Sequence, residues 1–296
     1  MKTSGPCFRV DQAEPEEHVM RDFIARPEHG IVWISGASSG IGRALALKLA
    51  GEGYKVAVTA RSHEKLVELQ AEARGLDGSI VVLDGDVTDA EDMEHAMASI
   101  EYEHGTLAMA ILNAGIYLPV HAEDLHRADF EKSFAVNLSG VVNCLLPAIR
   151  HMKAKGQGQI AIVSSVTGYG GLPTGAAYGA TKAALINMAE SLKFDLDKIG
   201  IRIQLISPGF VDTPATRKNA FPMPALVSID EAARQIAAGL KSQAFEITFP
   251  KRFTALMKLA RLLPYSAYFA LVNRVTGWRE RPSSTGRHPM TPHPAE

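Results

Sequence analysis

Apolar residues along the chain form two alternating patterns. Short runs rich in β-branched residues predict strands at Ile31–Ser35, Lys55–Thr59, Ser79–Leu83, Leu107–Leu112, Gln159–Ser164, Arg202–Ile206 and Phe245–Phe249. Between them, apolar positions recur at helical spacing over Ile41–Glu52, His63–Arg74, Ala90–His104, Ala122–Lys155, Ala176–Lys198 and Ser228–Lys241, and the fourth segment is long enough for two helices. Strands that alternate with helices in this way are typical of an α/β protein, a parallel sheet covered by helices on both faces.

The same pattern divides the chain into four parts. No repeat or linker interrupts residues 29–250, which we interpret as one domain, and residues 1–28 form a polar N-terminal extension. Residues 251–281 contain seven basic residues and one acidic residue, and their apolar positions predict a basic amphipathic helical extension. Residues 282–296 are rich in Pro, Ser and Thr and are predicted to be disordered.

The basic extension has three interpretations. By default it packs on the domain as extra helices. It could instead line the entrance to a substrate pocket, or lie on an anionic membrane surface as a basic amphipathic helix does.

Composition excludes several classes of protein and partner. The 296 residues are 46% hydrophobic and 21% charged, which excludes collagen-like, coiled-coil and disordered chains. A net charge of −1 gives no overall attraction to nucleic acid. Cys7 and Cys144 lie far apart, so we expect neither a disulfide framework nor a cysteine metal site, and the histidines show no ligand spacing.

Targeting signals give no indication of export or of a membrane span. The N-terminal residues lack the apolar core of a secretory signal. The uncharged stretch Ser133–Ile149 is interrupted by Asn137, Asn143 and Pro147, unlike a spanning helix. We therefore expect a cytoplasmic protein with at most a peripheral membrane contact.

A glycine-rich turn follows the first predicted strand and leads into a helix. Gly36, Gly40 and Gly42 have the spacing G-x-x-x-G-x-G. Glycines allow a tight turn, let the backbone approach a pyrophosphate, and direct helix N–H groups toward its charge. Hydroxyl groups of Ser35, Ser38 and Ser39 add donors. The alternative is a tight turn without a ligand, and the strand–turn–helix context favours the nucleotide.

The end of the second predicted strand indicates which dinucleotide is bound. NAD-binding folds place a carboxylate there to hold the ribose hydroxyls, whereas this chain has Ala60 followed by Arg61. A guanidinium suits a 2′-phosphate, so NADP(H) is favoured over NAD(H). The alternative is that Arg61 is an ordinary surface residue. Asp86 and Val87, after the third strand, are candidates to hold the adenine, although an Asp there could equally cap a helix.

A tyrosine and a lysine lie four residues apart in a predicted helix. Tyr178 and Lys182 therefore share one helical face. A neighbouring ammonium favours the phenolate and would lower the pKa of the tyrosine toward neutrality. Upstream, a predicted strand ends in Ser164 and Ser165, where ligands gather in an open α/β sheet.

Taken together, these residues resemble the short-chain dehydrogenase/reductase family, in its compact single-domain branch. The matching motifs cover about residues 30–250 in the family's order: SGASSGIG (35–42), Asp86-Val87, Asn113-Ala114-Gly115, Asn137, Ser164-Ser165, Tyr178-x-x-x-Lys182 and Pro208-Gly209. The resemblance implies a single Rossmann-type doubly wound parallel sheet of about seven strands. It also implies an NAD(P)-dependent oxidoreductase.

The resemblance further implies a catalytic tetrad of Asn137, Ser165, Tyr178 and Lys182. In the family's manner, Tyr178 protonates the carbonyl oxygen as hydride arrives, Ser165 hydrogen-bonds that oxygen, and Lys182 lowers the tyrosine pKa and holds the ribose. Asn137 helps to hold a water that links Lys182 to solvent. The implied cofactor-binding residues are Gly36, Ser38, Ser39, Gly40, Ile41, Gly42, Arg61, Asp86, Val87, Asn113, Ala114, Gly115, Tyr178, Lys182, Pro208, Gly209, Val211 and Thr213.

Two departures from the family pattern are visible. Leu112 precedes Asn113 where a second asparagine is common, and Ser35 replaces a threonine but keeps its hydroxyl. The family's usual assembly implies a homodimer or homotetramer through the helices at Asn137–Lys155 and Ala176–Lys198.

The substrate side is expected to be apolar. Phe221, Met223 and Leu226 would form a lid, and Tyr169 and Leu172 follow the catalytic strand. This favours a lipophilic ketone, aldehyde or alcohol, unless these residues only pack on the domain. Two other functions stay open: an extended-type epimerase or dehydratase, and a non-catalytic NADP(H)-sensing regulatory protein. The glycine spacing and the missing second domain argue against the first, and the intact tetrad argues against the second.

Overall fold

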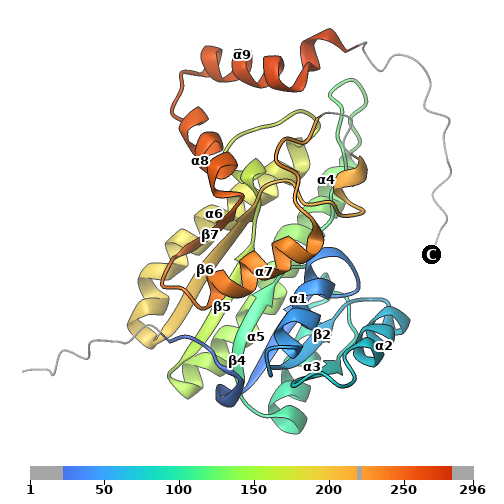
Figure 1. Ribbon diagram of the computed structural model, residues 1–296, viewed down its shortest axis with the longest axis vertical. Helices are drawn as coiled ribbons and strands as arrows, with labels where there is room; N and C mark the ends of the chain where they lie inside the picture. The colour runs from blue at the N-terminus through green and yellow to red at the C-terminus, as the bar shows by residue number, and fades with distance from the viewer. Residues whose placement is uncertain (1–22, 219–221, 282–296) are drawn as a thin grey trace, which may run out of the picture.

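A computed structural model describes residues 23–218 and 222–281 of the chain and contains one seven-stranded, fully parallel sheet (Figure 1). The strand order is β3-β2-β1-β4-β5-β6-β7, so the chain reverses its direction of winding between β1 and β4. Ligands of open α/β sheets bind at the carboxyl ends of the strands at such a reversal. The strands are β1 (Ile31–Ser35), β2 (Lys55–Thr59), β3 (Ser79–Val82), β4 (Leu107–Leu112), β5 (Gly158–Val163), β6 (Ile201–Pro208) and β7 (Glu246–Phe249).

Helices cover both faces of this sheet, as the alternation of apolar runs predicts. The period of two along β1 sends Val32 and Ile34 to one face and Ile31 and Trp33 to the other, and each set joins a separate buried cluster. The first cluster includes residues of α1 (Gly40–Ala50), α2 (His63–Glu72) and α7 (Ile229–Leu240), and the second includes residues of α3 (Ala90–Ser99), α5 (Gly140–Lys155) and α6 (Ala176–Leu196). The predicted doubly wound architecture is confirmed.

The segment Ala122–Lys155, which is long enough for two helices, contains two α-helices joined into one continuous run. The run consists of α4 (Arg127–Phe134), a π-helical turn η3 (Ala135–Ser139) and α5, with no break between them. In the described part of the chain, this run of 29 residues alone is long and apolar enough to pass as a membrane span. Its apolar face packs on the sheet through Val141, Cys144 and Leu145, which accounts for that character.

Short helical segments complete the fold. They are the 3₁₀ segments η1 (Pro27–His29), η4 (Val166–Gly168), η5 (Asp197–Ile199), η6 (Thr216–Lys218) and η7 (Trp278–Glu280), and a second π-helical turn, η2 (Ile100–His104), that ends α3.

The basic extension forms two helices beyond the carboxyl end of β7. They are α8 (Lys251–Ala260) and α9 (Tyr265–Thr276), and α9 lies across the top of the molecule in Figure 1. Phe253 packs against Phe210 with ring centroids 5.6 Å apart. The Tyr268 hydroxyl, buried against the domain, donates to the carbonyl of Gly171 at 3.0 Å. The tail predicted to be disordered and most of the N-terminal extension lie outside the described residues.

Candidate active site

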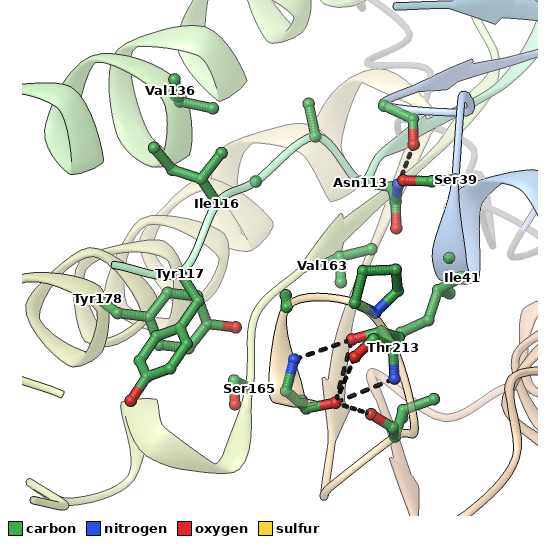
Figure 2. A pocket seen from close by; sticks show the side chains of 18 of the residues that line it. Ser39, Ile41, Asn113, Ile116, Tyr117, Val136, Val163, Ser165, Tyr178 and Thr213 are labelled. Carbon is green, nitrogen blue, oxygen red and sulfur yellow. Dashed lines mark hydrogen bonds between the residues drawn. The ribbon is translucent and has the colours of Figure 1, made fainter. Parts of the chain in front are cut away.

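A pocket of about 490 Å³ opens at the carboxyl ends of the strands, beside the neighbouring strands β1 and β4 (Figure 2). Its walls include every residue predicted to bind the cofactor except Gly42, together with Ser165 of the predicted tetrad. Gly42 and Asn137 lie behind the wall. The pocket therefore joins the glycine-rich turn to the Tyr178–Lys182 pair, which are more than 130 residues apart in the sequence.

The glycine-rich turn has the geometry of an anion-binding cradle. Gly36 has φ +71°, and a Cβ there would lie 2.6 Å from the backbone of Ala114. Gly40, with φ +58°, begins α1, and the side chain of the N-cap residue Ser39 does not bond the helix N–H groups. Those donors stay available to a pyrophosphate at the positive end of the helix, so the turn fits a dinucleotide.

Gly42 contributes to packing rather than to the pocket wall. A Cβ at this position would lie 2.4 Å from Asn113 Nδ2 and 2.5 Å from the carbonyl oxygen of Gly36. The glycine thus allows the turn to close against β4, and its contact with the cofactor stays a prediction.

Asn113 fixes the turn to the end of β4. Its Nδ2 donates to the carbonyls of Ser35 at 3.1 Å and Gly36 at 3.0 Å. In return, the Ser35 hydroxyl accepts from the backbone N–H groups of Asn113 and Ala114, both at 3.2 Å. The hydroxyl that replaces the family's threonine thus ties β1 to β4 at the floor of the pocket.

Cationic and hydroxyl side chains gather at the far end of the pocket from Tyr178. Arg61 and Asp86 form an ion pair at 4.0 Å, and the Arg61 side chain is largely exposed. Ser62 and Lys65 line the same region. Lys65, in the first turn of α2, was not singled out in the sequence analysis. Together these groups can accommodate a phosphate beside a ribose.

Asp86 and Val87 are held in place by bonds that the sequence did not reveal. Asp86 accepts from the backbone N–H of Thr88 at 2.9 Å, whereas Asp89 caps α3, so the capping alternative for Asp86 is wrong. Asn143 Nδ2 donates to the carbonyl of Val87 at 2.9 Å. Val87 consequently forms a fixed apolar surface at the adenine end of the pocket.

The two serines after β5 have different environments. The Ser164 hydroxyl donates to the main-chain carbonyl of Lys182 at 2.8 Å, which fastens β5 to α6. The Ser165 hydroxyl accepts from the backbone N–H of Thr167 at 3.2 Å and points toward Tyr178 (Figure 2). Because its acceptor side is occupied, the Ser165 proton can be directed at an oxygen in the pocket. Of the two serines, Ser165 is therefore the one placed for chemistry.

Tyr178 is a protonated phenol at neutral pH. Burial raises its pKa to about 12, although a hydrogen bond with Ser165 lowers it. This differs from the expectation that the adjacent lysine lowers the pKa, because the desolvation of the phenolate outweighs the favourable contacts. The ring packs edge-on against Tyr117, with centroids 5.2 Å apart.

Lys182 is a buried cation that pairs with no carboxylate among the described residues. It is 3% exposed, and its ammonium donates to the carbonyl of Val163 at 2.8 Å. Burial lowers its pKa to about 8. An ammonium has three donor hydrogens, so this group can also donate to ligand hydroxyls in the pocket that it lines.

Asn137 lies in the π-helical turn η3 and is completely buried. Its Oδ1 accepts from the N–H of Ile116 at 2.7 Å, and its Nδ2 donates to the carbonyl of Ile116 at 2.9 Å and to the Thr181 hydroxyl at 3.3 Å. Single π-helical turns are frequent at functional sites. Here the turn places one amide between the end of β4 and the helix that carries Tyr178 and Lys182.

The loop after β6 closes one side of the pocket. Pro208, Gly209, Val211 and Thr213 line it, and the backbone N–H and hydroxyl of Thr213 bond the Thr216 hydroxyl at 2.9 and 3.2 Å. A Cβ on Gly40 would lie 3.7 Å from the Thr213 methyl. The loop and the glycine-rich turn thus lie close to each other at this side of the pocket.

Of the residues predicted on the substrate side, one lines the pocket and three described ones lie elsewhere. Leu172 lines the pocket. Tyr169 instead bonds Glu246 of β7 and lies 5.2 Å from the Lys258 ammonium, so it belongs to the junction with α8. Met223 and Leu226 do not line the pocket, and Phe221 lies outside the described residues. The apolar wall comes instead from Ile116, Tyr117, Val136 and Phe210, which sequence patterns did not single out.

A resident metal has no evident site in residues 23–218 and 222–281. No group of three or more His, Cys, Asp or Glu side chains there could hold an ion. The polar groups of the pocket are hydroxyl, amide and cationic groups and the single carboxylate of Asp86. This donor set suits a dinucleotide and a neutral substrate oxygen.

Comparison with known proteins gives the same picture. The short chain dehydrogenase family profile matches residues 30–222. An uncharacterized oxidoreductase of Myxococcus xanthus is 32% identical over 252 residues, which are 85% of this chain and all of that protein. A 3-oxoacyl-(acyl-carrier-protein) reductase of Thermotoga maritima is 34% identical over 193 residues, 65% of this chain and 78% of its own length.

Solved structures share the fold. The alcohol dehydrogenase from the archaeon Thermococcus sibiricus, complexed with 5-hydroxy-NADP, superposes with a TM-score of 0.68 at 27% identity, covering 74% of this chain and 95% of that one.

Proposed function

The chain belongs to the short-chain dehydrogenase/reductase family of NAD(P)-dependent oxidoreductases, and we propose that it uses NADP(H) to interconvert a ketone or aldehyde and an alcohol on a lipophilic small molecule. One observation carries this proposal. Ser165, Tyr178 and Lys182 line the same pocket as the glycine-rich turn, so an acid and a dinucleotide site share one cavity.

Bound NADPH supplies a hydride to the carbonyl carbon. The chain's own residues bind and protonate the carbonyl oxygen. Tyr178 is protonated at neutral pH and donates its hydroxyl proton to the carbonyl oxygen as negative charge develops there. Ser165 donates a hydrogen bond to the same oxygen, and its orientation is fixed by Thr167. In the reverse direction Tyr178 removes the proton of the alcohol.

Lys182 and Asn137 serve as supports for Tyr178. The Lys182 ammonium donates to Val163 and has further donors for the ribose hydroxyls, and its charge favours the phenolate that forms after proton transfer. A Cβ on Gly115 would lie 3.4 Å from Asn137 Oδ1 and 3.5 Å from Lys182 Nζ. The space left by this glycine can hold the water that returns a proton from solvent through Lys182.

The preference for NADP(H) rests on charge. Arg61, Lys65 and the Ser62 hydroxyl line the end of the pocket, where a carboxylate would be expected for NAD(H). Asp86 forms an ion pair with Arg61 at 4.0 Å, which leaves guanidinium donors for a phosphate. Relatives in this fold include the alcohol dehydrogenase described above with 5-hydroxy-NADP.

A lipophilic substrate is supported by the wall beside Tyr178. Ile116, Tyr117, Val136 and Leu172 line this side of the pocket, together with the ring of Phe210. Apolar walls with a few directed polar groups bind ligands of that kind. A nucleotide sugar, as an epimerase requires, would find few partners for its hydroxyls here. A pure sensor of NADP(H) would not need Ser165 and Tyr178 directed at one point.

The experiment is a panel of ketones, aldehydes and secondary alcohols of graded chain length, assayed by NADPH and NADH absorbance. We expect turnover that improves with chain length and with NADPH over NADH. Turnover of none of these compounds, with NADPH bound tightly, would favour the sensor. Turnover of nucleotide sugars alone would favour the epimerase.

Assembly in the cytoplasm as a homodimer or homotetramer completes the proposal. The outer faces of α5 and α6 expose large apolar side chains, Leu146 and Phe194, that a second copy would cover. Light scattering of Leu146→Ser and Phe194→Ser variants tests this, because both substitutions should shift the mass toward the monomer.

A further inference from the structure

The helical extension exposes an apolar surface that the domain does not cover. We define the α8–α9 patch as Leu256, Leu259, Leu262, Leu263, Tyr265 and Phe269, whose side chains are between 40% and 81% exposed. Exposed leucines are ordinary when they are scattered, but a contiguous group of this kind marks an interaction site.

These residues lie close together along the extension. Leu256 and Leu259 lie three residues apart on α8, and Leu262 and Leu263 lie in the turn between α8 and α9. On α9, the rings of Tyr265 and Phe269 stack with centroids 6.0 Å apart. Other side chains of the extension are already covered: Thr254, Ala260 and Tyr268 are buried against the domain. The patch is therefore a second apolar face, additional to the one that packs.

The charge around the patch restricts its partner. Residues 251–281 carry seven basic residues and one acidic residue, whereas the whole chain has a net charge of −1. Arg252 and Arg261 are exposed beside the leucines, and Arg274 lies on α9. Apolar side chains with basic ones beside them are typical of surfaces that lie on anionic lipid, where the basic groups are attracted to the headgroups.

A second copy of the chain suits this surface poorly. A two-fold contact would bring the same patch of each copy together, and with it two sets of uncompensated arginines. A bilayer with anionic headgroups accepts both the leucines and the arginines. We infer that the α8–α9 patch lies on an anionic membrane surface, with Leu259 and Leu262 in the interfacial region.

The extension is also connected to the pocket. Phe253 of α8 packs on Phe210, which lines the pocket, and a Cβ on Gly209 would lie 3.0 Å from the Phe253 ring. Tyr268 of α9 bonds Gly171, the neighbour of the lining residue Leu172. Docking on lipid would thus place the pocket near a source of apolar substrate. This consequence, unlike the docking itself, rests on the proposed function.

Vesicle flotation of the full chain tests the inference. The wild type should float with phosphatidylcholine vesicles that contain phosphatidylglycerol, bind less as salt rises, and bind pure phosphatidylcholine weakly. The double variant Leu259→Ser, Leu262→Ser should bind about tenfold less, because two exposed leucines lose their burial in the interface. Arg252→Glu with Arg261→Glu should also lose binding. Tyr102→Ser, a 93% exposed aromatic outside the patch, is the matched control and should bind as the wild type does.

Each alternative has its own signature. Equal flotation of the wild type and the leucine variant, or no flotation of either, would overturn the inference. A dimer that dissociates in the leucine variant, without vesicle binding by the wild type, would assign the patch to a second copy and likewise overturn it. Because these leucines lie outside the pocket, reduction of a short water-soluble ketone should be unchanged in the variant. Failure of that reaction in the wild type would count against the proposed function and not against docking.

Discussion

The Lys182 ammonium lies 5.5 Å from the centre of the Tyr178 ring and donates to the carbonyl of Val163. The pair is therefore not joined by a direct hydrogen bond, and each group is dominated by its own burial. Burial raises the pKa of Tyr178 to about 12 and lowers the pKa of Lys182 to about 8. At neutral pH the Tyr178 phenol therefore keeps its proton and lies beside the Lys182 ammonium.

The raised pKa of Tyr178 predicts different pH profiles for the two directions. Reduction needs the protonated phenol, which persists through neutral pH, so its kcat/KM should change little between pH 6 and 8. Alcohol oxidation needs the phenolate, so its kcat/KM should rise with pH, by up to about tenfold per unit. Steady-state rates in both directions check this. Oxidation that is fastest below pH 7 would contradict it.

The lowered pKa of Lys182 predicts an effect on stability. In the unfolded chain the lysine keeps its proton to about pH 10.5, whereas in the folded chain it loses it near pH 8. Between these values the unfolded state binds more protons, so this residue's contribution to the free energy of unfolding rises with pH, by at most about 1.4 kcal/mol per unit.

Thermal unfolding of the wild type and of Lys182→Met measures that contribution. The melting temperature of the wild type, relative to the variant, should rise from pH 7 to pH 9.5, by about 2–4 °C for each kcal/mol. A difference that stays constant over this range would mean that Lys182 does not titrate in the window.

The space beside Gly115 predicts the effect of one methyl group. Gly115→Ala adds a Cβ in ordinary contact with Asn137 Oδ1 and Lys182 Nζ, so the fold should tolerate it, but a bridging water would be excluded. We expect kcat to fall about tenfold or more, with NADPH affinity changed only a few-fold. Gly171→Ala, which meets no atom within 4 Å, is the control. An unchanged kcat would remove the water from the account.

The charge of Arg61 predicts cofactor selectivity. Arg61→Ala should weaken NADPH binding by about tenfold or more, because a charge-assisted hydrogen bond to phosphate is lost, and should leave NADH binding nearly unchanged. Arg74→Ala, an exposed arginine just beyond the end of α2, is the matched control. Titration by fluorescence gives both affinities. Equal losses of affinity for the two cofactors would show that Arg61 does not bind the 2′-phosphate.

The strands and the cofactor side of the site could be predicted from the sequence because their signals are local. Buried parallel strands are continuous apolar runs, and the glycines of the turn are required by the backbone at Gly36 and Gly40. Tyr178 and Lys182 needed only helical spacing. The doubly wound topology of the sheet has no local signal in the sequence, and its prediction came from the resemblance to the family.

What the sequence missed depends on contacts between distant segments. In the π-helical turn, the Asn137 amide bonds the backbone of Ile116. The periodicity of apolar residues along the sequence does not predict such a turn. Gly42 and Tyr169 carry the right residue types but face Asn113 and Glu246 instead of the pocket. The apolar wall is assembled from four different segments, so its members could not be recognised one at a time.

Proton donation by Tyr178 is most directly tested by a single substitution. Turnover of a ketone by Tyr178→Phe should be measured beside its NADPH affinity, with Tyr117→Phe as a control that lines the same pocket. We predict a loss of about 10²–10⁴-fold in kcat for Tyr178→Phe with NADPH still bound, and near-normal turnover for the control. Ketone reduction by Tyr178→Phe at the wild-type rate would contradict the account.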